Sequence, residues 1–251
     1  MSGPPADSGG CAGRIHSWDL STGVDGPGTC FVLFTSGCPL RCLYCQNPDT
    51  WHMRDGRPAS VDDVMTEIDK YRSFIEAAGG GVTLSGGEPL LQPRFTAGIF
   101  RRCKELGLHT ALDTSGLLGA HADDALLADT DLVLLDIKSF DVGTYRRLTG
   151  GKLAPTLSFA TRLNRLGVPV WIRYVLVPGW TDDEEAIDGL AAFLAGLDNV
   201  ERVDVLPFHK LGAAKYDALG IPFPLRDTPV PDAALVARVR GQFRARGLRA
   251  D

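Results

Sequence analysis

From Gly28 onward, short apolar runs alternate with longer stretches in which apolar residues recur at helical spacing. Most of the short runs are continuous and are bounded by Gly, Pro, Asp or Thr, which is typical of strands covered on both faces. The pattern predicts strands at Cys30–Thr35, Val82–Leu84, His109–Leu112, Leu132–Ile137, Val168–Val177 and Val203–Phe208.

Amphipathic stretches separate these runs and predict helices. Ser60 is suited to cap the first helix, with Asp62 and Asp63 in its first turn. Thr181, with Glu184 three residues on, predicts a capping box at a later helix. The predicted helices are Val61–Ala78, Leu91–Leu106, Asp123–Ala128, Val142–Leu148, Thr156–Leu166 and Asp182–Leu197, followed by a basic C-terminal helix at Pro231–Arg246.

Six successive strand-then-helix units predict an α/β fold with a parallel sheet and right-handed crossovers. Both an open doubly wound sheet and a partial barrel fit this pattern. The sequence has no internal repeat and no linker. We therefore expect a mobile N-terminal tail over residues 1–12 and a single domain over residues 13–251 that ends in the C-terminal helix.

Composition and charge narrow the function classes. The 251 residues are 44% hydrophobic and 23% charged, as in an ordinary globular protein. No apolar run approaches the roughly 18 to 20 residues that span a bilayer, and Met1–Gly10 lacks the basic and apolar regions of a secretory signal. The net charge is −5 with no basic block, which argues against a nucleic-acid partner. We expect a cytoplasmic protein that binds neither membrane nor nucleic acid.

Three cysteines, Cys38, Cys42 and Cys45, lie close together directly after the first predicted strand. Their C-x3-C-x2-C spacing lets three thiolates converge on one metal centre. An iron–sulfur cubane would use the three thiolates and leave one iron open. A structural zinc ion would need a fourth ligand, for which His52 is the nearest candidate. The third interpretation is that these are coincidental core thiols.

The cysteine motif, with an aromatic residue before its last cysteine, is similar to the cluster motif of the radical S-adenosylmethionine enzymes. Within them, the chain resembles the family of pyruvate formate-lyase activating enzymes, which are glycyl-radical activases. The segments that carry this resemblance are Gly13–Ser17, Val24–Gly28, Cys38–Cys45 with Asp49–Trp51, Gly80–Thr83, Gly86–Glu88, His109–Thr110, Asp113–Thr114, Asp131–Val133, Asp136–Lys138, Val170–Val175, Val177–Trp180 and Leu206–His209. Together and in this order they are highly specific.

Six groups of residues within these segments share one position relative to the predicted sheet, because each lies late on, or just after, a predicted strand. The carboxyl ends of parallel strands meet at one edge of a sheet, so we expect six loops to converge on one mouth. In strand order the loops carry Cys38–Cys45, Gly86–Glu88, Asp113–Thr114, Asp136–Lys138, Arg173 with Pro178, and His209.

The resemblance implies a partial (β/α)6 barrel of the TIM type with outer helices and a cluster loop after the first strand. It implies a 4Fe–4S cluster on Cys38, Cys42 and Cys45 and S-adenosylmethionine chelated to the open iron, where one-electron cleavage gives methionine and a 5′-deoxyadenosyl radical. The residues that it assigns to the cofactor are Tyr44, Cys45, Gln46, Gly86, Gly87, Glu88, Asp136, Ile137, Lys138, Arg173 and His209. It adds a possible monovalent cation at Asp113, Thr114 and Asp136, and a substrate groove bordered by Asp25.

Several of these residues have a plainer interpretation when taken alone. Glu88 reads as an exposed residue in a turn, and Asp25 as part of a type II turn. Asp113 and Asp136 read as helix caps at strand ends, and Arg173 as a salt-bridge partner within the sheet. The resemblance to the family favours the functional interpretation, and the expected convergence of these residues at one edge of the sheet agrees with it.

The chain departs from the family at three places. Gln46 stands where the best-known members have His, which removes an imidazole beside the cofactor. Phe208 stands where Tyr is expected, and the N-terminal extension to about Ala12 has no counterpart. None of these departures involves the cysteines.

The predicted function is anaerobic activation of pyruvate formate-lyase, in which the radical abstracts a hydrogen atom from a glycine Cα. The implied partners are pyruvate formate-lyase and, as electron donor, flavodoxin or ferredoxin, and we expect a monomer. The alternative is activation of a different glycyl-radical enzyme, although residues 46–81 lack the extra cysteines that many such activases carry. A non-catalytic metal-binding or redox-sensing module would explain the cysteines but not the other strand-end segments.

Overall fold

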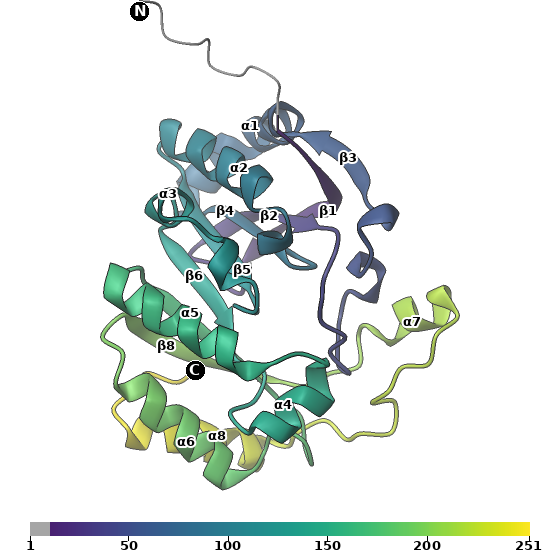
Figure 1. Cartoon of the computed structure of the whole chain (residues 1–251), viewed down its shortest axis with the longest axis vertical. Helices are drawn as coiled ribbons and strands as arrows, with labels where there is room; N and C mark the ends of the chain where they lie inside the picture. Colours follow the sequence, from purple (N-terminus) through teal and green to yellow (C-terminus); the bar gives the residue numbers. More distant parts are fainter. Residues whose placement is uncertain (1–10) are drawn as a thin grey trace, which may run out of the picture.

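Eight strands form one sheet in the order β3-β1-β2-β4-β5-β6-β7-β8, within the residues 11–251 that the computed structural model describes (Figure 1). Strand β3 (Arg57–Ser60) stands at one edge and β8 at the other, and they do not pair with each other, so the barrel is open on one side. The predicted parallel core is confirmed. Its strands are β2 (Thr29–Thr35), β4 (Gly81–Gly86), β5 (His109–Thr114), β6 (Leu132–Asp136), β7 (Val170–Leu176) and β8 (Val200–Pro207).

The sequence pattern missed the two antiparallel strands, β1 (Ala12–Thr22) and β3. The register of β1 against β2 shifts between Ile15 and Ser17, so a bulge interrupts the two-residue alternation that would have revealed the strand. The tail expected over residues 1–12 lies outside the described residues except for Cys11 and Ala12, and Ala12 already belongs to β1.

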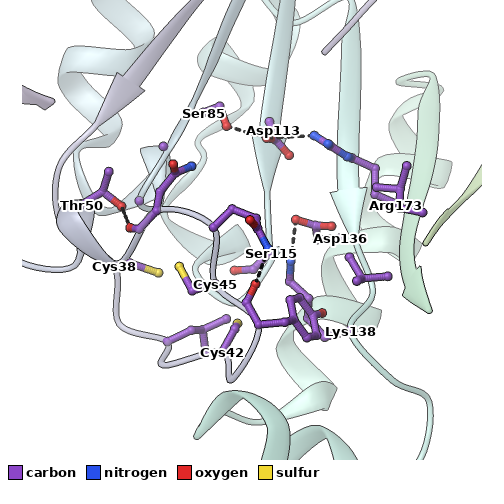
Figure 2. A pocket seen from close by; sticks show the side chains of 18 of the residues that line it. Cys38, Cys42, Cys45, Thr50, Ser85, Asp113, Ser115, Asp136, Lys138 and Arg173 are labelled. Carbon is purple, nitrogen blue, oxygen red and sulfur yellow. Dashed lines mark hydrogen bonds and ion pairs between the residues drawn. The ribbon is translucent and has the colours of Figure 1, made fainter. Parts of the chain in front are cut away.

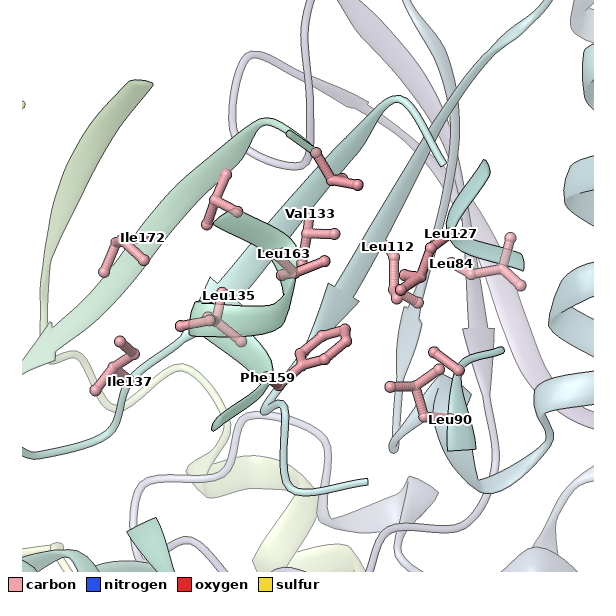
Figure 3. Packing of buried hydrophobic residues seen from close by; sticks show 14 of the residues in the cluster. Leu84, Leu90, Leu112, Leu127, Val133, Leu135, Ile137, Phe159, Leu163 and Ile172 are labelled. Carbon is pink, nitrogen blue, oxygen red and sulfur yellow. The ribbon is translucent and has the colours of Figure 1, made fainter. Parts of the chain in front are cut away.

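Most of the helices cover one face of the sheet, and the main core lies between them and the strands. Figure 3 shows Leu112, Val133 and Leu135 of neighbouring strands packed against Phe159 and Leu163 of one helix. The helices are α1 (Val61–Ala77), α2 (Pro93–Glu105), α3 (Asp124–Ala128), α4 (Val142–Thr149), α5 (Leu153–Leu166), α6 (Glu184–Ala195), α7 (Ala213–Leu219) and α8 (Ala233–Ala245). Among the described residues, no helix is long and apolar enough to cross a membrane.

One predicted helix cap is confirmed and another is wrong. Ser60 caps α1 and forms a capping box with Asp63. At α6 the cap is Asp183, whose carboxylate accepts from the N–H of Ala186. The Thr181 hydroxyl is engaged elsewhere, because it donates to the carbonyl of Val175 and accepts from the N–H of Val177. The Thr181 hydroxyl therefore stabilises the tight turn after β7 and does not cap α6, contrary to the prediction from the sequence pattern.

The opposite face of the parallel strands lines the interior of the open barrel. Residues of β7 point alternately to the two faces of the sheet. Ile172 and Tyr174 are buried against the helices, whereas Trp171, Arg173 and Val175 face the other side and are only half-buried. Charged side chains at the carboxyl ends of the strands therefore point into this interior. The alternation places the functional residues on a surface that the helices do not fill.

Candidate functional site

The cysteine loop begins where β2 ends and is held on both sides by main-chain hydrogen bonds. On one side the N–H of Cys38 donates to the carbonyl of Trp51 at 3.0 Å. On the other side, the N–H groups of Arg41 and Leu43 donate to carbonyls at the C-terminal end of α4, at 2.8 and 2.9 Å. The loop thus uses the free carbonyls of a helix end to satisfy its own donors.

A second hydrophobic cluster packs beneath this loop, apart from the main core. Its buried members are Tyr44, Leu148, Val177, Phe208, Tyr216, Phe223 and Leu225, and Cys42 and Cys45 pack against it. Residues from the loop, from α4 and from the segment after β8 therefore share one small core. This packing fixes the cysteines relative to the strand ends.

The three cysteines line one pocket at the carboxyl ends of the strands, and their sulfurs face the same space (Figure 2). Burial raises the pKa of Cys38 and of Cys42 to about 12 and also raises that of Cys45. Without metal, the site therefore holds neutral thiols. Binding of iron would supply the positive charge that stabilises the thiolates.

The three thiols are compatible with an iron–sulfur cluster. In residues 11–251, no group of three or more His, Cys, Asp or Glu side chains is placed to hold one metal ion. His52, the candidate fourth zinc ligand, is exposed and does not line the pocket. In a cubane each thiolate binds a different iron, so the sulfurs must face one cavity but need not meet at one atom.

Gly86 and Gly87 form the pocket wall beside Cys38. Gly86 has φ 105°, and a Cβ on Gly87 would lie 2.3 Å from the carbonyl oxygen of Gly37. The N–H of Gly87 donates to the carbonyl of Thr35 at 2.8 Å, which draws the end of β4 against the start of the cysteine loop. Only glycine allows this approach, and it leaves main-chain atoms open to the pocket.

The structure revises the expectation for Glu88. Its side chain is 1% exposed and does not line the pocket. It accepts from the hydroxyl of Thr114 at 2.6 Å, from the hydroxyl and N–H of Ser115 at 2.6 and 3.1 Å, and from the N–H of Leu90 at 3.2 Å. The carboxylate is therefore neither an exposed turn residue nor free to meet a cofactor ammonium group, and it ties the ends of β4 and β5 together.

A row of charges crosses the pocket opposite the cysteines (Figure 2). Arg173 Nη1 lies 3.1 Å from Asp113 Oδ2 and 3.4 Å from Asp25 Oδ1, while Lys138 Nζ lies 2.7 Å from Asp136 Oδ2. Both interpretations of Arg173 are compatible with this geometry, because it pairs within the sheet and also lines the pocket. Three carboxylates face two cations, and the buried Asp113 Oδ1 has no hydrogen-bond partner among the described residues. The row can therefore accept one further positive charge.

Asp113 makes the stability of the cluster-free protein depend on pH. Burial, reinforced by Asp136 and opposed by Arg173, raises its pKa from 3.8 to about 6. The folded state then holds more protons than the unfolded state in this window, so the free energy of unfolding falls as pH rises from about 4 to about 6. We expect Asp113→Asn to flatten this fall by about 2 kcal/mol, measured by urea unfolding across the window. An unchanged slope in Asp113→Asn would contradict this assignment.

Most of the residues assigned from the sequence are brought together at this pocket. Glu88, Ile137 and Asp25 are not part of its lining: Ile137 is buried in the main core, and Asp25 reaches the site only through Arg173. Those that line it are Cys38, Cys42, Tyr44, Cys45, Gln46, Gly86, Gly87, Asp113, Thr114, Asp136, Lys138, Arg173 and His209.

Sequence reasoning assigned no role to several other lining residues. Ser85, whose hydroxyl donates to Asp113 Oδ2 at 2.5 Å, lies directly before the glycine pair, and Ser115 directly follows Thr114. Their adjacency to assigned positions was the available signal. Others, including Leu40, Asn47, Val175 and Leu206, carry no chemical signature that separates them from ordinary loop or strand residues.

The chain is similar to known proteins over most of its length. Residues 32–191 match the Radical SAM superfamily. The pyruvate formate-lyase 1-activating enzyme of Escherichia coli is 45% identical over 231 residues, which cover 91% of this chain and 94% of that protein. The pyruvate formate-lyase-activating enzyme of Staphylococcus aureus is 47% identical over 229 residues, covering 88% of this chain and 90% of that protein.

Solved structures show the same architecture. A domain of pyruvate-formate lyase-activating enzyme from Bacteroides vulgatus has a TM-score of 0.57 at 29% identity, covering 69% of this chain and 98% of that one. A radical SAM methyltransferase from Sphaerobacter thermophilus has a TM-score of 0.62 at 17% identity, covering 92% of this chain and 67% of that one. The second similarity concerns the fold alone.

Proposed function

Because this chain belongs to the pyruvate formate-lyase activating enzymes of the Radical SAM superfamily, we propose that it generates the glycyl radical of pyruvate formate-lyase. The observation that carries the proposal is the convergence of three cysteines with the residues of five other strand ends on one pocket. When bound, a 4Fe–4S cluster and S-adenosylmethionine supply a 5′-deoxyadenosyl radical that removes hydrogen from a glycine Cα.

In this proposal, residues of the chain bind and orient the cluster and S-adenosylmethionine. Cys38, Cys42 and Cys45 would hold the cluster as thiolates, and the second hydrophobic cluster, against which Cys42 and Cys45 pack, would shield one side of it from solvent. Gly86 and Gly87 offer main-chain atoms at close range to the methionine part of the cofactor. The other cofactor contacts that we propose are Tyr44, Gln46, Asp136, Ile137 through its main chain, Lys138, Arg173 and His209. Glu88 does not contact the cofactor in this proposal. It holds Thr114 and Ser115 of the pocket in place by accepting hydrogen bonds from their hydroxyl groups.

We extend the proposal to the charge row. Asp25, Asp113 and Asp136 outnumber Arg173 and Lys138 by one, and Asp113 Oδ1 has no hydrogen-bond partner within residues 11–251. This surplus supports a monovalent cation at Asp113, Thr114 and Asp136, because an unpaired buried carboxylate oxygen is costly. Asp25 borders the groove for the glycine loop of the partner protein.

The chemistry also defines the partners and surroundings. One electron must enter for each cleavage, which we assign to flavodoxin or ferredoxin as donor. An open iron is sensitive to oxygen, so we expect function under anaerobic or reducing conditions in the cytoplasm. We propose a monomer that binds pyruvate formate-lyase transiently. A different glycyl-radical enzyme remains the second candidate partner, whereas family membership removes the non-catalytic module from consideration.

The test uses anaerobic, iron-reconstituted protein with dithionite and S-adenosylmethionine. We expect 5′-deoxyadenosine and, on addition of pyruvate formate-lyase, the doublet of a glycyl radical in electron paramagnetic resonance. Deoxyadenosine without that doublet would move the substrate to another glycyl-radical enzyme. Neither signal in protein with full iron content would overturn the proposed function.

A further inference from the structure

The side-chain amide of Gln46 joins two segments that lie far apart in the sequence. Its Nε2 donates to the carbonyl oxygens of Tyr44 and His209, both at 3.2 Å, and its Oε1 accepts from the N–H of Gly212 at 2.7 Å. Gln46 directly follows the last cysteine of the cluster loop, whereas His209 and Gly212 belong to the turn after β8. One side chain therefore fastens this turn to the loop both as donor and as acceptor.

The contact leaves little space for a side chain larger than that of glycine at position 212. A Cβ on Gly212 would lie 2.9 Å from Oε1 of Gln46, 3.0 Å from its Cα and 3.1 Å from the carbonyl oxygen of Cys45. Gly212 has φ −71°, which any residue adopts, so the restriction is one of space and not of conformation. Gln46 and Gly212 thus form a matched pair across the two segments.

What the pair holds in place is one wall of the pocket. Phe208 and His209, the first two residues of the fastened turn Phe208–Gly212, line the pocket together with Gln46 itself. Beneath them, Phe208 belongs to the second hydrophobic cluster, which packs against Cys42 and Cys45. The turn is therefore attached to the cluster loop by apolar packing below and by the Gln46 amide at the pocket. Packing fixes the distance between the two segments, and the amide fixes the orientation of the turn.

On the basis of the function proposed above, we infer that Gln46 is a positioning residue for S-adenosylmethionine, with Gly212 as its partner. It holds the Phe208–Gly212 turn in the orientation that the cofactor pocket needs, a role beyond its own contact with the cofactor, and it does not act on the reacting atoms. A glutamine amide presents a donor and an acceptor side by side in a single protonation state, so the contact needs no particular tautomer. The residue that departs from the family's His therefore has a defined task in this chain.

The test measures the dissociation constant for S-adenosylmethionine in anaerobic, cluster-loaded protein. Gln46→Met keeps the length of the side chain and removes its donor and acceptor. We expect an increase of about tenfold in the dissociation constant, because two to three partly shielded hydrogen bonds are lost. The iron content should stay unchanged, and hydrogen exchange at the Gly212 amide should accelerate.

Gln92→Met is the matched control. Gln92 makes the same two-way contact elsewhere: its Oε1 accepts from the N–H of Arg14 at 2.7 Å, and its Nε2 donates to the carbonyls of Arg14 and Ser36 at 2.8 and 3.0 Å. It does not line the pocket. We expect this variant to lose stability while its dissociation constant for S-adenosylmethionine stays that of the wild type.

A second variant approaches the contact from the other side. Gly212→Ala should also raise the dissociation constant, because the added methyl group forces the turn away from Gln46 and Cys45. Gly241→Ala in α8, where a Cβ would meet nothing within 4 Å, should leave it unchanged. Equal dissociation constants for wild type and Gln46→Met, with faster exchange at Gly212, would overturn this inference alone. Failure of the wild type to bind S-adenosylmethionine would overturn the proposed function and this inference with it.

Discussion

Replacing Cys42 by alanine is expected to abolish both cluster assembly and radical formation. Cys42 is the middle residue of the three that face the pocket, and the other cysteines within residues 11–251 do not line it, so no further thiol is placed to replace Cys42. Two thiolates leave two irons of a cubane without protein ligands. We expect the iron and sulfide content and the charge-transfer absorption of Cys42→Ala to fall to background, and no 5′-deoxyadenosine to form.

Cys103→Ala serves as the control for loss of a thiol as such. Cys103 lies in α2, is fully buried in the main core and is absent from the pocket. Its replacement removes one sulfur atom from packed surroundings, which costs about 1 to 2 kcal/mol in the free energy of unfolding. We expect wild-type iron content and activity. Full iron loading of Cys42→Ala, or equal loss of iron in both variants, would contradict the ligand assignment.

The parallel core was predictable because β2, β4, β5 and β6 are buried along most of their length and therefore appear as largely continuous apolar runs. The sequence pattern was misleading at β1 and at the start of α6, where local geometry decides the structure. The register shift in β1 disrupts the alternation of a half-exposed strand. At α6, Thr181 and Asp183 are both good capping residues, and only the tight turn after β7 decides that Thr181 is used inside the turn.

The candidate site also has features that the sequence predicts and features that it does not. The residue types and their position after each strand were predictable, because parallel strands bring their carboxyl ends to one edge. The specific hydrogen-bond partners of each side chain were not predictable. Gln46 finds its acceptor and donor partners at His209 and Gly212, more than 160 positions away, and no local pattern encodes that contact. Glu88 stands beside two pocket glycines in sequence, yet its carboxylate turns away from the pocket toward Thr114 and Ser115.

The orientation of Glu88 leads to the second large expected effect, on stability. Glu88→Ala leaves two hydroxyl groups and two main-chain N–H groups without their acceptor in a site that is 1% exposed, and it opens a cavity beside them. We expect a loss of about 3 to 4 kcal/mol in the free energy of unfolding. For a chain of this length this corresponds to a fall of about 10 °C in Tm, measured by thermal unfolding of the cluster-free protein.

Two further variants distinguish the effect of the Glu88 hydrogen bonds from the effect of its charge and from the effect of removing any glutamate side chain. Glu88→Gln keeps the shape and one acceptor oxygen but turns an NH2 group toward hydroxyl and N–H donors, so it should lose about half as much as Glu88→Ala. Glu105→Ala removes a carboxylate that is 60% exposed, and it should change the free energy of unfolding by less than about 0.5 kcal/mol. If Glu88→Ala were as stable as Glu105→Ala, the carboxylate would not be tying β4 to β5. The ends of β4 and β5 would then be held by their main-chain pairing and by the hydrogen bond from Ser85 to Asp113.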